Sequence, residues 1–146
     1  MKRIIAFDLG TKTLGIAVSD ALGIAAHGLE NFRFTEGAYQ TAITHAIQVI
    51  NKEKVDEVVI GLALNMDGTE SKSSKASSIF KDELLKRNPK LKITMVDERM
   101  STMLATRRLL ESDISRAKRK KVIDMQSAVV ILETYMEMKK NGQTKR

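Results

Sequence analysis

Apolar positions recur along the chain with two different periods, and these periods predict its secondary structure. Short apolar runs, several of them rich in β-branched residues, predict strands at residues 3–8, 13–19, 24–34, 57–62 and 91–96. Apolar residues at helical spacing predict helices at about residues 36–50, 70–87, 102–110 and 120–138. The order β-β-β-α-β-α-β-α-α predicts an α/β fold. Its mixed five-stranded sheet would have three antiparallel strands, then two strands reached by crossovers, with helices on both faces.

Polar residues between these elements predict where the helices begin and end. Thr35 and Ser101 are expected to cap the first and third helices, and Pro89 should end the second helix near Asn88. Residues 112–119 interrupt the helical pattern, so we expect a basic loop there and a last helix that begins near Lys120. Residues 1–138 are therefore expected to form one domain, and residues 139–146 a polar, frayed tail.

The composition is typical of a globular domain. The chain has 146 residues, of which 42% are hydrophobic, and this length can bury a core. The absence of cysteine excludes disulfides and thiolate metal sites. We expect a cytoplasmic protein, because the sequence contains no secretory signal pattern and no apolar stretch near the roughly 20 residues of a membrane span.

Positive charge is concentrated in one part of the sequence. The net charge is +7 and the pI is about 9.7, and most of the excess lies between Arg99 and Lys121. A clustered basic stretch attracts polyanions, nucleic acid first among them. A solvated charged surface would produce the same pattern, so both interpretations stay open on charge alone.

Three acidic residues lie where the predicted fold gives no reason for a charge. Asp8 ends the first strand, Glu98 follows the fifth strand beside Asp97, and Asp124 shares a helix face with apolar residues. Each strand-end acid alone is more simply a turn former. If all three converge, they need the counter-charge that a hard divalent cation supplies. Two such ions about 4 Å apart can activate a water molecule and stabilise the leaving oxygen of a phosphodiester, so we expect one or two Mg²⁺ or Mn²⁺ ions here.

The loop at residues 65–69 (N-M-D-G-T) follows a buried strand. Ligands bind at the carboxyl ends of strands in sheets of this kind, although a plain glycine turn explains the loop equally well. The serines that follow can hydrogen-bond phosphates, but they more simply begin and solvate a helix.

Four motifs, taken in order, resemble the YqgF/RuvX family of bacterial RNase H-like proteins. They are residues 8–20 (DLGTKTLGIAVSD), 61–69 (GLALNMDGT), 96–102 (VDERMST) and 120–124 (KKVID) with the apolar helix that follows. The resemblance covers almost the whole chain. It implies an RNase H-like fold and a metal-dependent phosphodiesterase in which Asp8, Glu98 and Asp124 are catalytic and hold the metal. Two positions depart from the family pattern: Ala63 stands in place of a usual proline, and Thr13 in place of a frequent arginine.

The resemblance implies a nuclease that processes the 5′ end of pre-16S rRNA, a structured RNA, during ribosome biogenesis and in contact with ribosomal particles. The alternatives are a resolvase of branched DNA (Holliday junctions) and a non-catalytic nucleic-acid-binding assembly factor. An actin-like ATPase, which has a similar first motif, is rejected because 146 residues hold only one domain. We expect nucleic acid to contact Lys12, Asn65, Arg99, Arg116, Lys118, Arg119, Lys120 and Lys121.

The sequence leaves open the choice of RNA or DNA, the cleavage polarity and the metal. It also does not decide whether Glu98, Asp97 or Asp67 is the second acid, or whether the protein is a monomer or a dimer.

Overall fold

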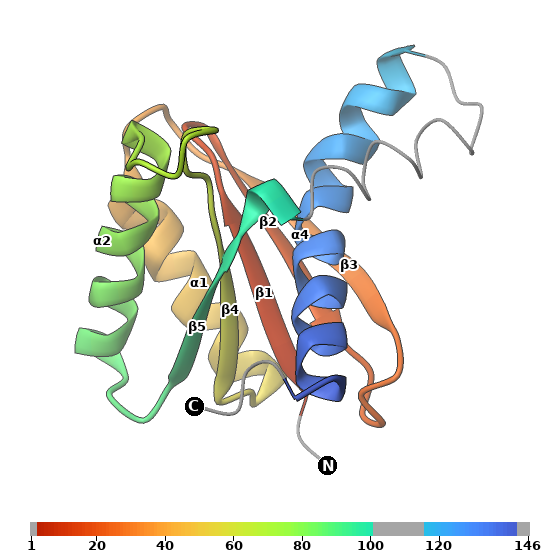
Figure 1. Ribbon diagram of the computed structural model, residues 1–146. Coiled ribbons are helices and arrows are strands. Elements are labelled where there is room, and N and C mark those ends of the chain that lie inside the picture. The colour runs from red at the N-terminus through yellow and green to blue at the C-terminus, as the bar shows by residue number, and fades with distance from the viewer. Residues whose placement is uncertain (1–2, 101–115, 143–146) are drawn as a thin grey trace.

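The computed structural model describes residues 3–100 and 116–142, with side chains for residues 3–100 and 127–142. A five-stranded sheet carries helices on both faces (Figure 1). The elements are, in order, β1 (Ile4–Leu9), β2 (Thr13–Ser19), β3 (Ala26–Arg33), α1 (Tyr39–Glu53), β4 (Glu57–Leu62), α2 (Lys72–Arg87), β5 (Lys92–Asp97) and α4 (Arg116–Lys140). The helix predicted at residues 102–110, with its cap Ser101, lies outside the described residues.

The strands are arranged in the order β3-β2-β1-β4-β5. β1, β2 and β3 pair antiparallel, as two successive hairpins require, and β4 and β5 join in parallel through the crossover helices α1 and α2. The predicted mixed sheet is therefore confirmed. Because β1 and β4 are parallel and central, their carboxyl ends lie together at one edge of the sheet, and β5 ends at the same edge (Figure 1).

Alternation along β1 divides its side chains between two cores. Ile5 and Phe7 are fully buried on the face covered by α1 and α2, where the rings of Phe7 and Phe80 meet edge to face at 5.6 Å. Ile4 and Ala6 pack on the other face with apolar residues of α4. Burial of each large apolar side chain stabilises the fold by about 1.5–3 kcal/mol. By the same alternation, Asp8 lies on the α4 face.

α4 packs across β1, β2 and β3 through a buried stripe that includes Ala128, Ile131 and Tyr135. The predicted loop at residues 112–119 is wrong for its last four residues, because α4 already begins at Arg116. Lysine, arginine and alanine are good helix formers, so the helix extends by one turn. It also ends at Lys140 instead of residue 138, and the Lys139 ammonium lies 3.1 Å from the Glu57 carboxylate.

The predicted cap of the first helix is also wrong. α1 begins at Tyr39, its preceding residue makes no side-chain cap bond, and Thr35 contributes only its backbone carbonyl to the turn before the helix. α2 is capped by Ser71, whose hydroxyl oxygen accepts a hydrogen bond from the Ser74 backbone N–H at 3.0 Å. The Ser74 hydroxyl oxygen accepts one from the Ser71 N–H in return, which satisfies two free donors at the helix start. The serines therefore begin the helix, as the simpler interpretation predicted.

The second helix ends where Pro89 predicts, with Asn88 as its C-cap. No helix within residues 3–100 and 116–142 combines the length and the apolar composition that crossing a membrane requires.

Candidate active site

The site is built around Asp8, which lies between two glycine positions of the sheet. Asp8 pairs with Gly15 of β2. On its other side, β4 is aligned so that Phe7 pairs with Ile60, and the next residue of β4 is Gly61. A glycine presents no side chain to the sheet surface. Neither neighbouring strand therefore places a side chain in the space beside the Asp8 carboxylate on the face covered by α4.

Glu98 occupies part of that space. It follows β5 directly and begins a helical turn. A Cβ atom added at Gly61 would lie 3.1 Å from Cγ and Cδ of Glu98, and 2.5 Å from Cδ1 of Ile131. Gly61 therefore provides the room in which Glu98 reaches across β4 toward Asp8, beneath α4.

The two carboxyl groups affect each other's ionisation. The pKa of Glu98 is raised from 4.5 to about 8, first by burial, then by the negative charge of Asp8 and by a hydrogen bond to Asp8, and last by the charge of Asp97. Burial and a neighbouring like charge both disfavour a second ionised carboxylate. The structure thus brings together two of the three predicted acids as a pair that retains a proton near neutral pH.

The third predicted acid, Asp124, is placed only by the backbone. It lies in α4, four residues before Ala128 and seven before Ile131, both of which are buried against the sheet. Helical spacing therefore puts its position on the same stripe. Among the side chains that the structure describes, no three potential metal ligands form a group. Asp124 as a member of the site stays a prediction.

The other two candidate acids are engaged elsewhere. Arg99 donates hydrogen bonds to both carboxylate oxygens of Asp97, with Nη2 2.6 Å from Oδ2, and these contacts lower the pKa of Asp97. Asp67 accepts hydrogen bonds from the backbone and hydroxyl of Thr69, which lower its pKa. Both carboxylates are stabilised in the ionised form. These contacts favour Glu98 over Asp97 and Asp67 as the partner of Asp8.

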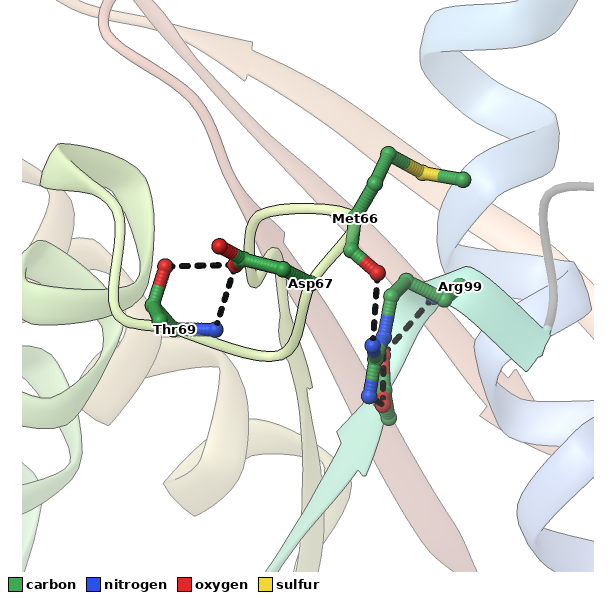
Figure 2. A network of polar contacts seen from close by, with 5 residues as sticks. Met66, Asp67, Thr69 and Arg99 are labelled. Atoms are coloured by element: carbon green, nitrogen blue, oxygen red, sulfur yellow. Dashed lines mark hydrogen bonds and ion pairs between the residues drawn. The ribbon is translucent and has the colours of Figure 1, made fainter.

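Arg99 also connects two loops at the edge of the sheet. Its Nη1 donates to the backbone carbonyl of Met66 at 3.1 Å, so the loop after β4 is held against the end of β5 (Figure 2). We call this set of contacts, made by Asp97, Arg99 and Met66, the loop clasp. The sequence predicts a nucleic-acid contact for Arg99 but gives no sign of the clasp, because Arg99 and Met66 lie 33 positions apart.

Two further residues predicted to bind nucleic acid lie at this edge. The Asn65 amide donates within its own loop, to the Thr69 hydroxyl at 2.9 Å and to the Glu70 carbonyl at 3.1 Å. Lys12 is exposed, and its ammonium lies 3.6 Å from the Glu36 carboxylate. Their contacts with nucleic acid stay predictions.

The remaining basic residues are placed by the backbone of α4. Arg116, Lys118, Arg119, Lys120 and Lys121 lie in its first turns, which extend beyond the end of the sheet near the site (Figure 1). Their side chains lie outside the described part of the chain.

Sequence reasoning did not single out Gly61 as a site residue. A glycine inside a β-branched strand indicates that another group approaches the backbone closely, and this signal was present in the sequence.

Comparison with known protein families matches residues 2–138 to the family described as "RuvX: Holliday junction resolvase". The chain belongs to the RuvX family. Its relatives include a "Putative pre-16S rRNA nuclease" of Staphylococcus carnosus (strain TM300), which is 48% identical over 92% of this chain and 95% of that protein. A protein of the same name from Staphylococcus aureus (strain JH9) is 44% identical over the same shares.

Solved structures with the same fold are distant in sequence from this RuvX-family chain. Thermus thermophilus RuvC, solved with a Holliday junction substrate, has a TM-score of 0.60 and 11% identity, and the match covers 97% of both chains. The fowlpox virus Holliday junction resolvase has a TM-score of 0.57 and 14% identity, over 92% of this chain and 98% of that one. The predicted family and RNase H-like fold are confirmed, and the prediction of a nuclease agrees with the names of the relatives.

Proposed function

We propose that this RuvX-family protein is a divalent-cation-dependent nuclease that hydrolyses phosphodiester bonds in structured RNA, at the 5′ end of pre-16S rRNA. The observation that carries the proposal is the Asp8–Glu98 pair. Asp8, in β1, and Glu98, in the helical turn after β5, share one partly buried position in which Glu98 has a pKa of about 8. Such a pair does not stabilise the fold, because burial and the neighbouring negative charge both disfavour the ionised carboxylates. Carboxyl groups with strongly shifted pKa values are concentrated at functional sites.

The chemistry of this pair fits a divalent cation. Carboxylate oxygens are the ligands that Mg²⁺ and Mn²⁺ prefer, and a cation would supply the positive charge that allows both acids to ionise. Gly61 leaves the room in which Glu98 approaches Asp8, and Gly15 adds no side chain on the other side of Asp8. Asp8, Glu98 and Asp124 would hold the ion or ions.

When bound, the ions would polarise the scissile phosphate and promote attack by water. The protein's own residues would prepare that step. Glu98 would release the proton that it shares with Asp8 when both acids act as ligands. Asp97 stays hydrogen-bonded to Arg99 in the loop clasp. The basic first turns of α4 would hold the nucleic-acid backbone.

RNA is favoured over DNA by the degree of similarity. The relatives named for pre-16S rRNA are 44–48% identical to this chain, whereas the solved resolvases are 11–14% identical and support the fold alone. The family's description nevertheless names Holliday junctions, so a four-way DNA junction is the second candidate substrate. Parallel cleavage assays on a precursor rRNA fragment and on a synthetic junction, in the same buffer with Mg²⁺, separate the two candidates.

The proposal is tested by Asp8→Asn. This variant removes one charge from the pair but keeps the shape of the side chain, so it should fold normally and lose cleavage of both substrates. Asp82→Asn, an exposed position on α2, is the matched control and should keep full activity. Retained cleavage by Asp8→Asn, after purification identical to that of the control, would overturn the proposed site.

A non-catalytic assembly factor gives a different result. Both the wild type and Asp8→Asn would then bind RNA with the salt sensitivity of phosphate contacts, and neither would show Mg²⁺-dependent turnover. Ribosomal particles as partners are tested by co-sedimentation of the protein with precursor subunits.

A further inference from the structure

The side chain of Asn31, on β3, contains a buried oxygen. Its Oδ1 atom is inaccessible to solvent and has no hydrogen-bond partner among the described residues. Native proteins pair nearly all buried acceptors, so an exception requires an explanation. Neither the confirmed fold nor the proposed acids provide one.

The strand register places Asn31 in the same row as Asp8. Asn31 pairs with Gly15 of β2, and Gly15 pairs with Asp8 of β1. The sequence neighbours of Asn31 face the other side of the sheet. Phe32 packs into the core beneath α1, and the Glu30 carboxylate is hydrogen-bonded to His45 of α1 at 2.7 Å. Since successive side chains alternate between faces, Asn31 lies on the α4 face, together with Asp8.

Gly15 is the only residue between them in this row, and it has no side chain. Neighbouring strands lie about 4.8 Å apart, so the backbones at Asp8 and Asn31 are separated by roughly 9.6 Å. The amide oxygen of Asn31 accepts hydrogen bonds, as a carboxylate oxygen of Asp8 does, so these two oxygens cannot bond each other. A group that bridges them must donate hydrogen bonds toward Asn31 and satisfy the negative charge of Asp8. A hydrated divalent cation has both properties.

We propose that Asn31 is a positioning residue of the cation site, and that its Oδ1 accepts a hydrogen bond from the hydration shell of an ion held at Asp8. This inference rests on the proposed function for the ion itself. Mg²⁺ keeps several of its waters when proteins bind it, and outer hydrogen-bond partners typically change metal affinity 10–100-fold. The unused oxygen then has a partner in the loaded protein, and β3 contributes to a site otherwise built from β1, β5 and α4.

The test measures Mn²⁺ binding and thermal unfolding of the full chain, without substrate. Asn31→Ala should unfold in EDTA at the temperature of the wild type or above it, because it removes an unpaired acceptor. It should bind Mn²⁺ about tenfold more weakly in calorimetry and gain less in unfolding temperature when Mn²⁺ is added. Asn51→Ala, an exposed position on α1, is the control and should match the wild type in both measurements.

Asn31→Asp gives the opposite pattern. A second negative charge in the row of Asp8 should lower the unfolding temperature in EDTA, and Mn²⁺ affinity should equal or exceed that of the wild type. If both Asn31 variants bind Mn²⁺ like the wild type, Asn31 has no role at the ion and the inference is overturned, while the proposed function stands. If the wild type and Asp8→Asn both fail to bind Mn²⁺, the proposed function is overturned as well.

Discussion

At the scale of single residues, the carboxyl group of Glu98 is controlled by its neighbours. Its pKa of about 8 lies well above the ordinary value of 4.5, because the side chain is largely buried and faces Asp8. An acid whose pKa is raised by folding binds protons more tightly in the folded state. It therefore leaves stability unaffected below about pH 4.5 and lowers it progressively as the pH rises from 4.5 to 8. Each pKa unit corresponds to about 1.4 kcal/mol.

Glu98→Gln removes this pH dependence. In EDTA, the variant and the wild type should have similar free energies of unfolding at pH 4, and the variant should be the more stable at pH 8, by at least about 1.4 kcal/mol. Urea unfolding followed by circular dichroism across this range measures the difference. Mn²⁺ should stabilise the wild type at pH 8 and have a weaker effect on the variant. Parallel stability curves for the two proteins in EDTA would contradict the pairing of Glu98 with Asp8.

Gly61 determines whether Glu98 has room to reach the site. An alanine there would place its Cβ 2.5 Å from Cδ1 of Ile131 and 3.1 Å from Glu98. Gly61→Ala should lower the free energy of unfolding by on the order of 1–3 kcal/mol, as overpacking does, and should reduce cleavage by displacing Glu98.

Ile131→Val supplies the compensating change, because valine lacks the Cδ1 atom. The double variant should lose less stability than the sum of the two single variants, since contacting residues are energetically coupled. Denaturant unfolding of the four proteins gives the coupling. Additive losses would show that α4 does not approach Gly61 as described.

At the scale of elements, the loop between β4 and α2 is held from both sides. Its own contacts run from Asn65 and Asp67 to Thr69, and Gly68 provides the turn with a φ of 89°. The loop clasp then fastens Met66 to the end of β5 through Arg99. Since Glu98 lies between the two residues of the ion pair in sequence, the clasp also restricts where Glu98 can point.

Arg99→Lys should open the clasp, because an ammonium group cannot bind both oxygens of Asp97 and the Met66 carbonyl in the planar geometry of a guanidinium. Amide hydrogen exchange at Gly68 and Thr69 should become faster, while exchange in α1 stays unchanged. Arg87→Lys is the control, since Arg87 bonds Thr44 and Gln40 on α1 instead. Unchanged exchange in the loop of Arg99→Lys would show that the clasp does not hold it.

At the scale of the whole molecule, the charge and the fold together would orient the protein on nucleic acid in the proposed function. The net charge of +7 is distributed unevenly, and the first turns of α4 bring part of it to the edge of the sheet where β1 and β5 end (Figure 1). Phosphate contacts release counterions, so the logarithm of the affinity falls linearly with the logarithm of the salt concentration.

Replacing Lys120 and Lys121 with glutamine should weaken RNA binding and reduce the magnitude of the salt slope by about two, because each lysine neutralises one phosphate. Fluorescence anisotropy in the Asp8→Asn background measures binding without cleavage. The control replaces Lys52 and Lys90 with glutamine. These exposed residues lie shortly before the amino ends of β4 and β5, away from the site, and their replacement should leave the salt slope unchanged. Equal slopes for the two double variants would show that α4 does not contact the backbone.

The sequence by itself determined the elements, the order of the chain through them and the acids worth considering. These features depend on local patterns: β-branched runs, helical spacing, and polar residues at strand ends. The five strands lie within about two residues of their predicted positions. The sequence also identified Asp8 and Glu98 as acids at positions where the predicted fold gives no reason for a charge. Errors arose where local signals were weak, as at Thr35 and at the start of α4, where packing and helix propensity decided the boundary.

Only the tertiary structure decided which of these acids meet. Asp97 and Glu98 are adjacent in sequence, yet Asp97 is held by Arg99 while Glu98 reaches Asp8 across Gly61. The placement of Asn31 in the row of Asp8 likewise depends on the register of three strands. Register, crossovers and the packing of α4 are set by contacts between distant parts of the chain, and a local pattern carries no information about them.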